Sequence, residues 1–197
     1  LTAQKLFREN SYEKTTVDDI ANHTGISKGS VYLEFKTKED IFYCILESYF
    51  KSQIEKFAQV VEQAKPPYLN VLKDFLINDV MNTFDLMGDI YQNCEALIYT
   101  NEKVKNKLMP LFNAWSDLCF CFLEKAKSNG EIDPNIDCKQ LTRAMDIASI
   151  GFYTPNNYYS YYTSETSSSQ KLCEIRNTLK KDVSFYLGII ISGLKVN

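Results

Sequence analysis

Histidine is almost absent from this sequence, and its scarcity limits the chemistry that the chain can perform. The 197 residues contain one histidine, His23, so a Ser-His or Cys-His catalytic pair would have to be built there, where no nucleophile motif lies nearby. A glycine-rich loop that cradles phosphate is also missing, as is a paired His/carboxylate spacing for a metal ion. We therefore expect no enzyme activity, no metal site and no cofactor.

Long apolar runs are missing as well. The longest, VSFYLGIIISGL, is too short to cross a bilayer. No signal peptide is recognisable, and six cysteines without the spacing of a disulfide framework indicate reduced thiols. These features predict a cytoplasmic protein with no membrane partner. Because Leu1 already lies in a helical pattern, we also expect native residues to precede it.

An excess of positive charge is not present either. The chain has 22 basic and 25 acidic residues and a net charge of -3. This balance excludes a globally basic nucleic-acid coat, although a local basic patch remains compatible with it. With 45% hydrophobic and 24% charged residues, the chain can bury ordinary cores and has no signature of disorder.

Strand signals are nearly absent, whereas helical periodicity recurs in almost every window. Thr16-Val-Asp-Asp19 and Thr37-Lys-Glu-Asp40 match capping boxes, which predict helices that begin directly after each threonine. We predict an all-α protein with an N-terminal three-helix domain at residues 1–45 and a C-terminal helical domain at residues 46–197. Beyond the first short helix, the expected helices are 17–23, one capped by Ser27, 38–64, 68–87, 90–100, 102–128, 137–153 and 170–193.

Two helices separated by HTGI have the dimensions of a helix-turn-helix. Ala21 allows the two helices to approach closely, and Gly25 supplies a turn with positive φ. The apolar residues expected to point inward are Ile20, Ile26 and Val31. The outer face then consists of Lys28, Gly29, Ser30, Tyr32 and Leu33.

Short polar residues at the start of a helix suit the major groove of DNA, where base edges and phosphates come close. Gly29 costs about 1 kcal/mol relative to alanine within a helix, so we expect its backbone to approach a partner closely. Lys28 and Lys38 can neutralise phosphates. Hydroxyls that suit phosphate lie at three helix N-termini, at Thr16, Ser27 and Thr37. By periodicity alone, a plain packing unit is an equal alternative.

Residues 3–42, AQKLFRENSYEKTTVDDIANHTGISKGSVYLEFKTKEDIF, resemble the N-terminal domain of the tetracycline-repressor (TetR) family of bacterial transcription regulators. Thr-Thr-Val, Asp-Ile-Ala, Gly-Ile-Ser and Lys-x-Lys-Glu all fall at the family's spacing. The resemblance implies a helix-turn-helix DNA-binding domain followed by a ligand-binding and dimerisation domain. The positions that match DNA contacts in the family are Thr16, Ser27, Lys28, Gly29, Ser30, Tyr32, Lys36 and Lys38.

Two features depart from the family pattern. Glu34 lies where the family usually has histidine or tyrosine, and its carboxylate repels phosphate unless it accepts from a cytosine amino group or turns away. Residues 1–50 carry six basic and eight acidic side chains, so we expect affinity to depend partly on residues before Leu1. Two alternatives to a ligand-responsive repressor stay open: a thiol-based redox-responsive regulator, and a ligand-binding module with weakened DNA binding.

A regulator of this kind needs a second site whose occupancy biases DNA binding. The aromatic, methionine and cysteine residues of the C-terminal part can line a pocket for a small, largely apolar effector. The same helical spacing also describes an ordinary core. The candidate pocket residues are Phe84, Met87, Tyr91, Cys94, Trp115, Cys119 and Phe122. The tyrosine-rich segment 154–169 is either a lid or a crossing loop.

Apolar stripes run along the two C-terminal helices. The family resemblance, with a weaker likeness in NGEIDPNIDCKQLTRAMDIASIGFY, implies that these helices pair with their symmetry mates as a four-helix bundle. A twofold dimer predicts a near-palindromic operator. Alternatively, both stripes pack within one subunit. The candidate dimer residues are Leu141, Ala144, Met145, Ala148, Phe152, Leu172, Ile175, Leu179, Val183, Tyr186 and Ile190.

Overall fold

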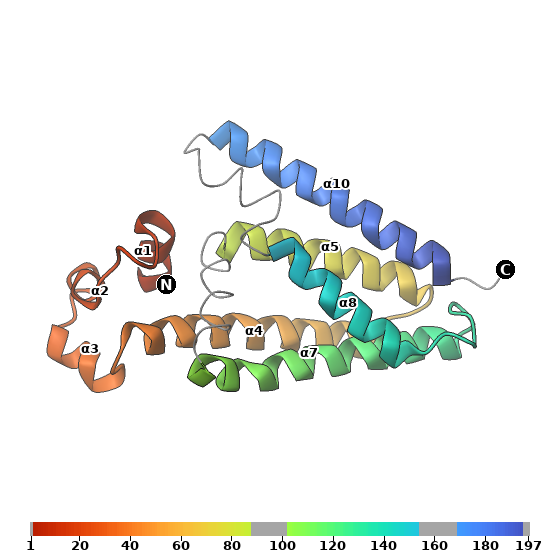
Figure 1. The fold of residues 1–197 in the computed structure, drawn as a ribbon, viewed down its shortest axis with the longest axis horizontal. Coiled ribbons are helices and arrows are strands. Elements are labelled where there is room, and N and C mark those ends of the chain that lie inside the picture. Colours follow the sequence, from red (N-terminus) through yellow and green to blue (C-terminus); the bar gives the residue numbers. More distant parts are fainter. Residues whose placement is uncertain (1, 88–101, 154–168, 195–197) are drawn as a thin grey trace. The chain divides into compact units, whose positions relative to one another are not determined.

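The computed structural model describes residues 2–87, 102–153 and 169–194. These residues form helices and no strand, so the predicted all-α class is confirmed (Figure 1). None of the helices in these ranges is long and apolar enough to span a membrane. The predicted helix 90–100 and the segment 154–168 lie outside them. The helices are α1 Thr2–Asn10, α2 Val17–Thr24, α3 Lys28–Glu34, α4 Lys38–Gln63, α5 Tyr68–Met87, α7 Glu102–Ser128, α8 Cys138–Tyr153 and α10 Ser169–Leu194.

The chain divides into two compact units, and each is described by itself. The first consists of Leu1–Ser52 and Met87–Leu111, and the second of Gln53–Leu86 and Phe112–Asn197. The division therefore falls within α4, before the last residue of α5, and within α7. The functional division predicted after residue 45 remains a prediction.

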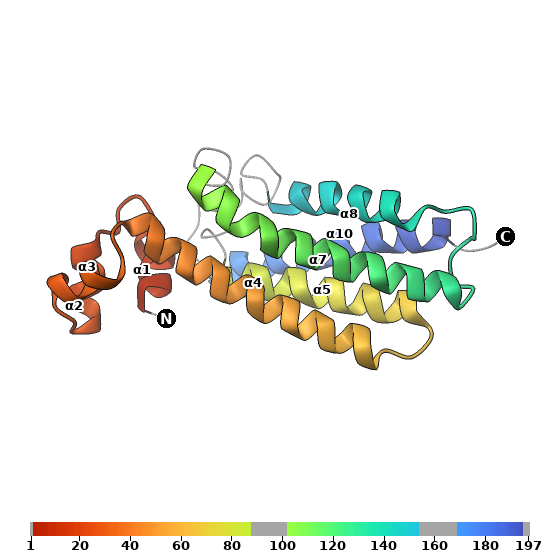
Figure 2. The same ribbon diagram turned by 90° about the horizontal axis from the view of Figure 1, so that it is seen from below.

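The first unit is built around an aromatic cluster. Phe7 on α1, Tyr12 in the following turn and Phe42 on α4 have ring centroids 4.8 to 5.7 Å apart, and both phenylalanines are fully buried. Buried Thr15 donates its hydroxyl to the carbonyl oxygens of Leu6 and Ser11, which satisfies the turn after α1. Figure 2 shows α1, α2 and α3 beside the first turns of α4. These contacts give the helix-turn-helix a rigid base.

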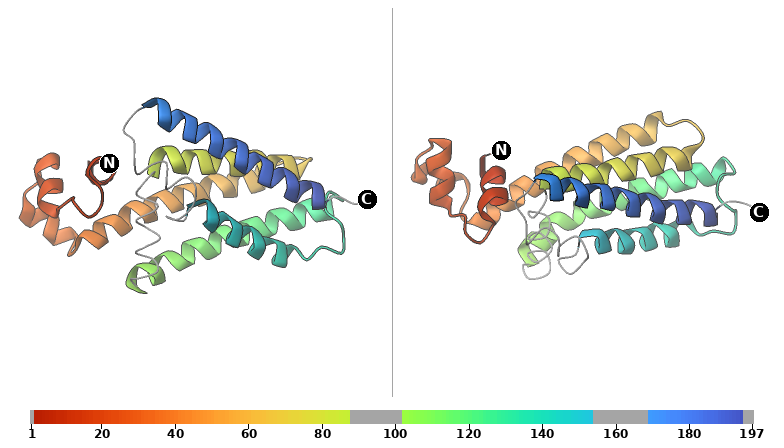
Figure 3. Two further views of the ribbon diagram at one scale, coloured as in Figure 1. Left: turned by 45° about the horizontal axis from the view of Figure 1, so that its top comes forward. Right: turned by 90° about the horizontal axis from the view of Figure 1, so that it is seen from above.

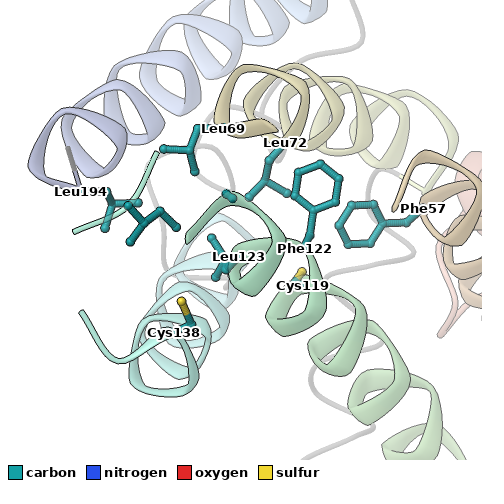
Figure 4. Close-up of a cluster of buried hydrophobic side chains, with 10 residues drawn as sticks. Phe57, Leu69, Leu72, Cys119, Phe122, Leu123, Cys138 and Leu194 are labelled. Atoms are coloured by element: carbon teal, nitrogen blue, oxygen red, sulfur yellow. The ribbon is translucent and has the colours of Figure 1, made fainter. Parts of the chain in front are cut away.

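The second unit has two apolar cores. Figure 3 shows α5 running alongside α10, and there Ile77 and Met81 pack against Leu179, Val183 and Leu187. The larger core draws side chains from five helices, and Figure 4 shows the buried side chains of this cluster. Its buried members include Phe57 on α4, Leu72 on α5, Phe122 on α7, Cys138 on α8 and Leu194 on α10.

A carboxylate fixes the start of α5. Glu131, in the turn after α7, accepts hydrogen bonds from the backbone N–H groups of Tyr68 at 2.8 Å and Leu69 at 2.9 Å. These N–H groups have no partner inside the helix, and the helix dipole favours a negative charge at this end. Glu131 therefore links two segments that are more than 60 residues apart in the sequence.

Candidate nucleic-acid interface

The helix-turn-helix is defined by local capping. At the start of α2, the Asp19 N–H donates to Thr16 Oγ1 at 3.1 Å, and Asp19 Oδ2 accepts from the Thr16 N–H at 2.8 Å. Hydrogen bonds from Thr16 also hold the pKa of Asp19 below its usual value. Gly25 closes α2 with φ 69°, and Ser27 Oγ accepts from the Ser30 N–H to start α3. The predicted capping box and the positive-φ turn are confirmed.

The inner face differs from the prediction at one residue. Ile20, Ala21 and Val31 are buried between the helices as expected. Ile26 was expected to point inward, and this was wrong, because its side chain is 50% exposed. The turn holds the Ile26 backbone N–H on the Ala21 carbonyl oxygen at 3.2 Å, which fixes the main chain while the side chain faces solvent.

The outer face of α3 brings Lys28 together with two neighbours. Lys28 Nζ donates to Asp18 Oδ2 at 2.7 Å and lies 5.9 Å from the centroid of the Tyr32 ring. The hydrogen bond that Lys28 donates to Asp18 raises the pKa of Lys28. Both partners are more than half exposed, so the ion pair is worth little and a phosphate can replace the carboxylate. The candidate DNA-contact residues that are exposed are Thr16, Ser27, Lys28, Gly29, Ser30, Tyr32 and Lys36.

Lys38 has a structural contact that sequence reasoning missed. Its Nζ donates to the Tyr12 carbonyl oxygen at 2.7 Å and to that of Glu13 at 3.3 Å, and it lies 4.3 Å from the centroid of the Tyr12 ring. Lys38 thus fastens the turn after α1 to the start of α4. Lys36, by contrast, donates to the Tyr32 carbonyl oxygen at 3.2 Å from an exposed position.

Gly29 has no packing requirement within the described residues. A Cβ built at this position would meet only Ser27 Oγ, at 3.9 Å. Alanine would therefore fit the chain itself and would favour the helix by about 1 kcal/mol. Space is left open on the outer face of α3, next to the exposed Ser30.

The predicted pocket residues that the structure describes lie in the cores. Cys119 and Phe122 are buried in the larger core, and the Trp115 ring lies 5.0 Å from that of Phe57. Phe84 packs against the smaller core. Burial raises the pKa of the Cys119 thiol, which disfavours the reactive thiolate. The Met87 side chain, Tyr91 and Cys94 lie outside the described parts.

A buried carboxylate in the second unit was not predicted. Asp79 Oδ1 is shielded from solvent and has no hydrogen-bond partner among the described residues. Burial raises the pKa of Asp79 to about 7, against the opposing charge of Lys56. The signal was present in the sequence, because Asp79 follows Phe75 by four residues and precedes buried Thr83 by four, which places it on the inward face of α5. No group of three or more His, Cys, Asp or Glu in the described ranges could hold a metal ion.

Most of the residues predicted to form the dimer interface pack against other residues of the same chain. Ile175, Leu179 and Val183 are buried, with Leu179 and Val183 in the smaller core, where Tyr186 also packs. Three others, Leu141, Met145 and Ile190, pack against the larger core. Ala144 is exposed and Ala148 is partly buried. The side chains of Phe152 and Leu172 lie outside the described parts. Other apolar side chains of the same two helices are exposed instead: Ile147 at 72%, Phe185 at 71% and Ile189 at 56%. A helix that packs on one face and exposes a second apolar face explains the difference.

Comparisons with known proteins agree with this architecture. The family model for bacterial regulatory proteins, tetR family, matches residues 2–43. The HTH-type transcriptional regulator QacR of Staphylococcus aureus is 32% identical over 136 residues, which cover 66% of this chain and 69% of QacR. The solved structure of the fatty acid degradation regulator FadR from Bacillus halodurans matches with a TM-score of 0.68 at 17% identity, over 91% of both chains.

Other relatives are matched over a smaller part of their length. YfiR of Bacillus subtilis, an uncharacterized HTH-type transcriptional regulator, is 23% identical over 67% of this chain and 65% of YfiR. YerO of the same organism is matched over 24% of its length, at 37% identity. The extent of the match to QacR, together with the N-terminal family match, shows that this chain belongs to the TetR family of bacterial regulatory proteins.

Proposed function

We propose that this protein is a DNA-binding transcriptional repressor whose affinity for its operator responds to a small molecule. The observation that carries the proposal is the outer face of α3. Its hydroxyl, lysine and tyrosine side chains are exposed, while Val31 is buried and fixes the helix. A short helix presented in this way suits the major groove. The proposed site of action is the cytoplasm, and the proposal includes no catalysis.

Phosphate contacts position the protein, and base contacts select the sequence. In the bound state, Lys28 exchanges Asp18 for a phosphate, and Lys36 supplies a second exposed cation. The Thr16 hydroxyl lies at the N-terminus of α2, where the helix dipole favours an anion. Lys38 contributes chiefly by holding the turn after α1. Because binding displaces counterions, the affinity falls steeply with salt.

We propose a homodimer formed through the exposed apolar side chains of α8 and α10. Phe185 and Ile189 are four residues apart and therefore lie on one face of α10. Ile147 adds an exposed apolar side chain on α8. Covering each of these side chains contributes about 1.5–3 kcal/mol. A twofold dimer presents two copies of α3 and reads a near-palindromic operator.

The proposed effector is small and largely apolar, and it binds within the helical second unit. Solved regulators of this fold include one in complex with stearoyl-CoA and one with choline. In this chain, Asp79 Oδ1 offers one buried acceptor among apolar side chains. An effector that prefers one conformation of the dimer shifts the population away from the DNA-binding one.

Fluorescence anisotropy with duplexes from the region upstream of the protein's own reading frame tests the proposed function. We expect sequence-preferring binding that weakens as salt rises. Tyr32→Ala should weaken it, whereas Lys139→Ala, at an exposed position of the second unit, should not. Equal affinity for these duplexes and for shuffled duplexes at every salt concentration would refute DNA recognition.

A further inference from the structure

Exposed apolar side chains gather at α3. Seven large apolar side chains are exposed among the described residues, and three of them fall within the eight residues from Ile26 to Leu33. Leu33 has the largest exposed fraction of the seven, 79%. Single exposed leucines are common on protein surfaces. Tyr32 and Leu33 lie on the seven-residue helix α3, and Ile26 lies in the turn before it. This concentration of exposed apolar side chains indicates a surface that becomes covered.

Leu33 has no part in holding the helix in place. Val31 is buried and Phe35 is partly buried, and the Phe35 N–H closes α3 on the Val31 carbonyl oxygen at 2.8 Å. Leu33 points away from these residues into solvent. Its replacement should therefore leave the fold of the first unit intact, which makes a functional test possible.

Leu33 shares its face of α3 with Ser30 and Gly29, three and four residues earlier. A helical side chain leans over the turn that precedes it, so Leu33 covers the turn that contains Gly29. A Cβ at Gly29 would meet nothing nearer than Ser27 Oγ, at 3.9 Å. The surface beside Leu33 is therefore open to a group that approaches from outside.

Within the proposed function, on which this inference rests, we propose that Leu33 determines operator specificity by contacting the 5-methyl group of a thymine. In the major groove every base pair presents hydrogen-bonding groups. Thymine also presents its 5-methyl group there, an apolar group that distinguishes it from the other bases. Leucine offers no donor or acceptor, so contact with a hydrogen-bonding group would bury that group without a partner. Contact with a methyl group removes apolar surface of both partners from water.

The polar side chains near Leu33 lie where they can contact phosphates and polar base edges, which leaves the apolar contact to Leu33. Lys28 Nζ is held by Asp18 on the outer side of the helix, where a phosphate can replace the carboxylate. The Ser30 hydroxyl lies 2.8 Å from Ser27 Oγ at the first turn. Leu33 is thus the apolar residue among side chains that can bind phosphates and polar base edges.

The test uses duplexes that wild-type protein enriches from a random-sequence pool. Each thymine of an enriched duplex is replaced in turn by deoxyuridine, which removes only the 5-methyl group. We expect one thymine position in each half-site at which this change weakens wild-type binding about fourfold, the value for burial of one methyl-sized group. For Leu33→Ala, the thymine and deoxyuridine duplexes should bind equally at that position.

Two further variants keep the comparison informative. Leu33→Met retains an apolar group and should therefore retain the preference for thymine over deoxyuridine. This variant provides the comparison if Leu33→Ala binds too weakly for its affinities for the two duplexes to be compared. Met109→Ala, which removes an exposed apolar side chain of α7, should keep the full deoxyuridine effect. Thermal unfolding should show that Leu33→Ala has the stability of the wild-type protein.

The possible failures are distinguishable. If the pool yields no enriched sequence, the proposed function fails. If enrichment succeeds and no deoxyuridine substitution weakens binding, Leu33 reads no thymine methyl and the inference is overturned. The same holds if a deoxyuridine effect persists unchanged in Leu33→Ala, or if Leu33→Met loses the preference.

Discussion

Replacing Asp79 by asparagine removes a buried charge from the second unit without changing the size of the side chain. Asp79 Oδ1 is buried without a partner among the described residues, and burial raises the pKa of Asp79 from 3.8 to about 7. Of the charged groups around it, Lys56 opposes this shift, and the negative charge of Asp79 in turn raises the pKa of Cys119. An ionised Asp79 therefore destabilises the folded protein.

The sign of the pH dependence follows from proton binding. The folded state keeps the Asp79 proton up to about pH 7, whereas the unfolded chain releases it near pH 3.8. Between these values the folded state binds more protons, so this group makes the free energy of unfolding fall as pH rises, until the fall ends above pH 7. A shift of roughly three pH units corresponds to about 4 kcal/mol as an upper limit.

Urea unfolding of wild-type protein and Asp79→Asn, at one protein concentration and at several values between pH 4 and pH 8, measures this difference. We expect similar stabilities near pH 4 and a variant that is more stable than wild type at pH 8, by up to about 4 kcal/mol. Asp74→Asn, at an exposed position of the same helix, should show no such divergence. A difference between Asp79→Asn and wild type that does not change with pH would refute the reasoning.

Three further predictions concern contacts of the described residues. Glu131→Gln should lower the free energy of unfolding by about 1–3 kcal/mol, because the charged acceptor at the start of α5 is lost; an unchanged urea midpoint would contradict it. Lys38→Met should speed hydrogen exchange in α1 and α2, since the Tyr12 and Glu13 carbonyl oxygens lose their donor; exchange at the wild-type rate would show that this contact does not hold the turn. Phe185→Glu should lower the sedimentation coefficient to that of a monomer, while Lys180→Glu, at an exposed position on a different face of α10, should stay dimeric; a dimer in both would place the interface elsewhere.

Helix boundaries could be predicted because their signals are local. Thr16 and Ser27 cap helices that start one residue later, Gly25 ends α2 in the left-handed conformation, and Pro66 follows shortly after the end of α4. The helix bounds 68–87 and 102–128 agree with the structure residue for residue. Each signal acts over one turn of helix, so a single sequence is sufficient to reveal it.

Contacts between distant residues could not be predicted. From the sequence, Lys38 was expected to be available for phosphate. In the structure, its Nζ donates to the carbonyl oxygens of Tyr12 and Glu13, which lie 26 and 25 residues earlier. Ile26 follows the apolar pattern of its neighbours, but the turn directs its side chain outward. On α10 two apolar faces compete, and periodicity does not distinguish the face that packs on α5 from the face that carries Phe185.

Enrichment of duplex DNA from a random-sequence pool is the most direct test that α3 reads an operator. Wild-type protein should enrich two similar half-sites related by twofold symmetry, with an affinity that falls steeply as salt rises. A variant with Lys28→Ala and Tyr32→Ala should lose this enrichment while it keeps its fold. A wild-type pool that shows no enriched sequence, or the same half-sites enriched by the variant, would contradict DNA recognition through α3.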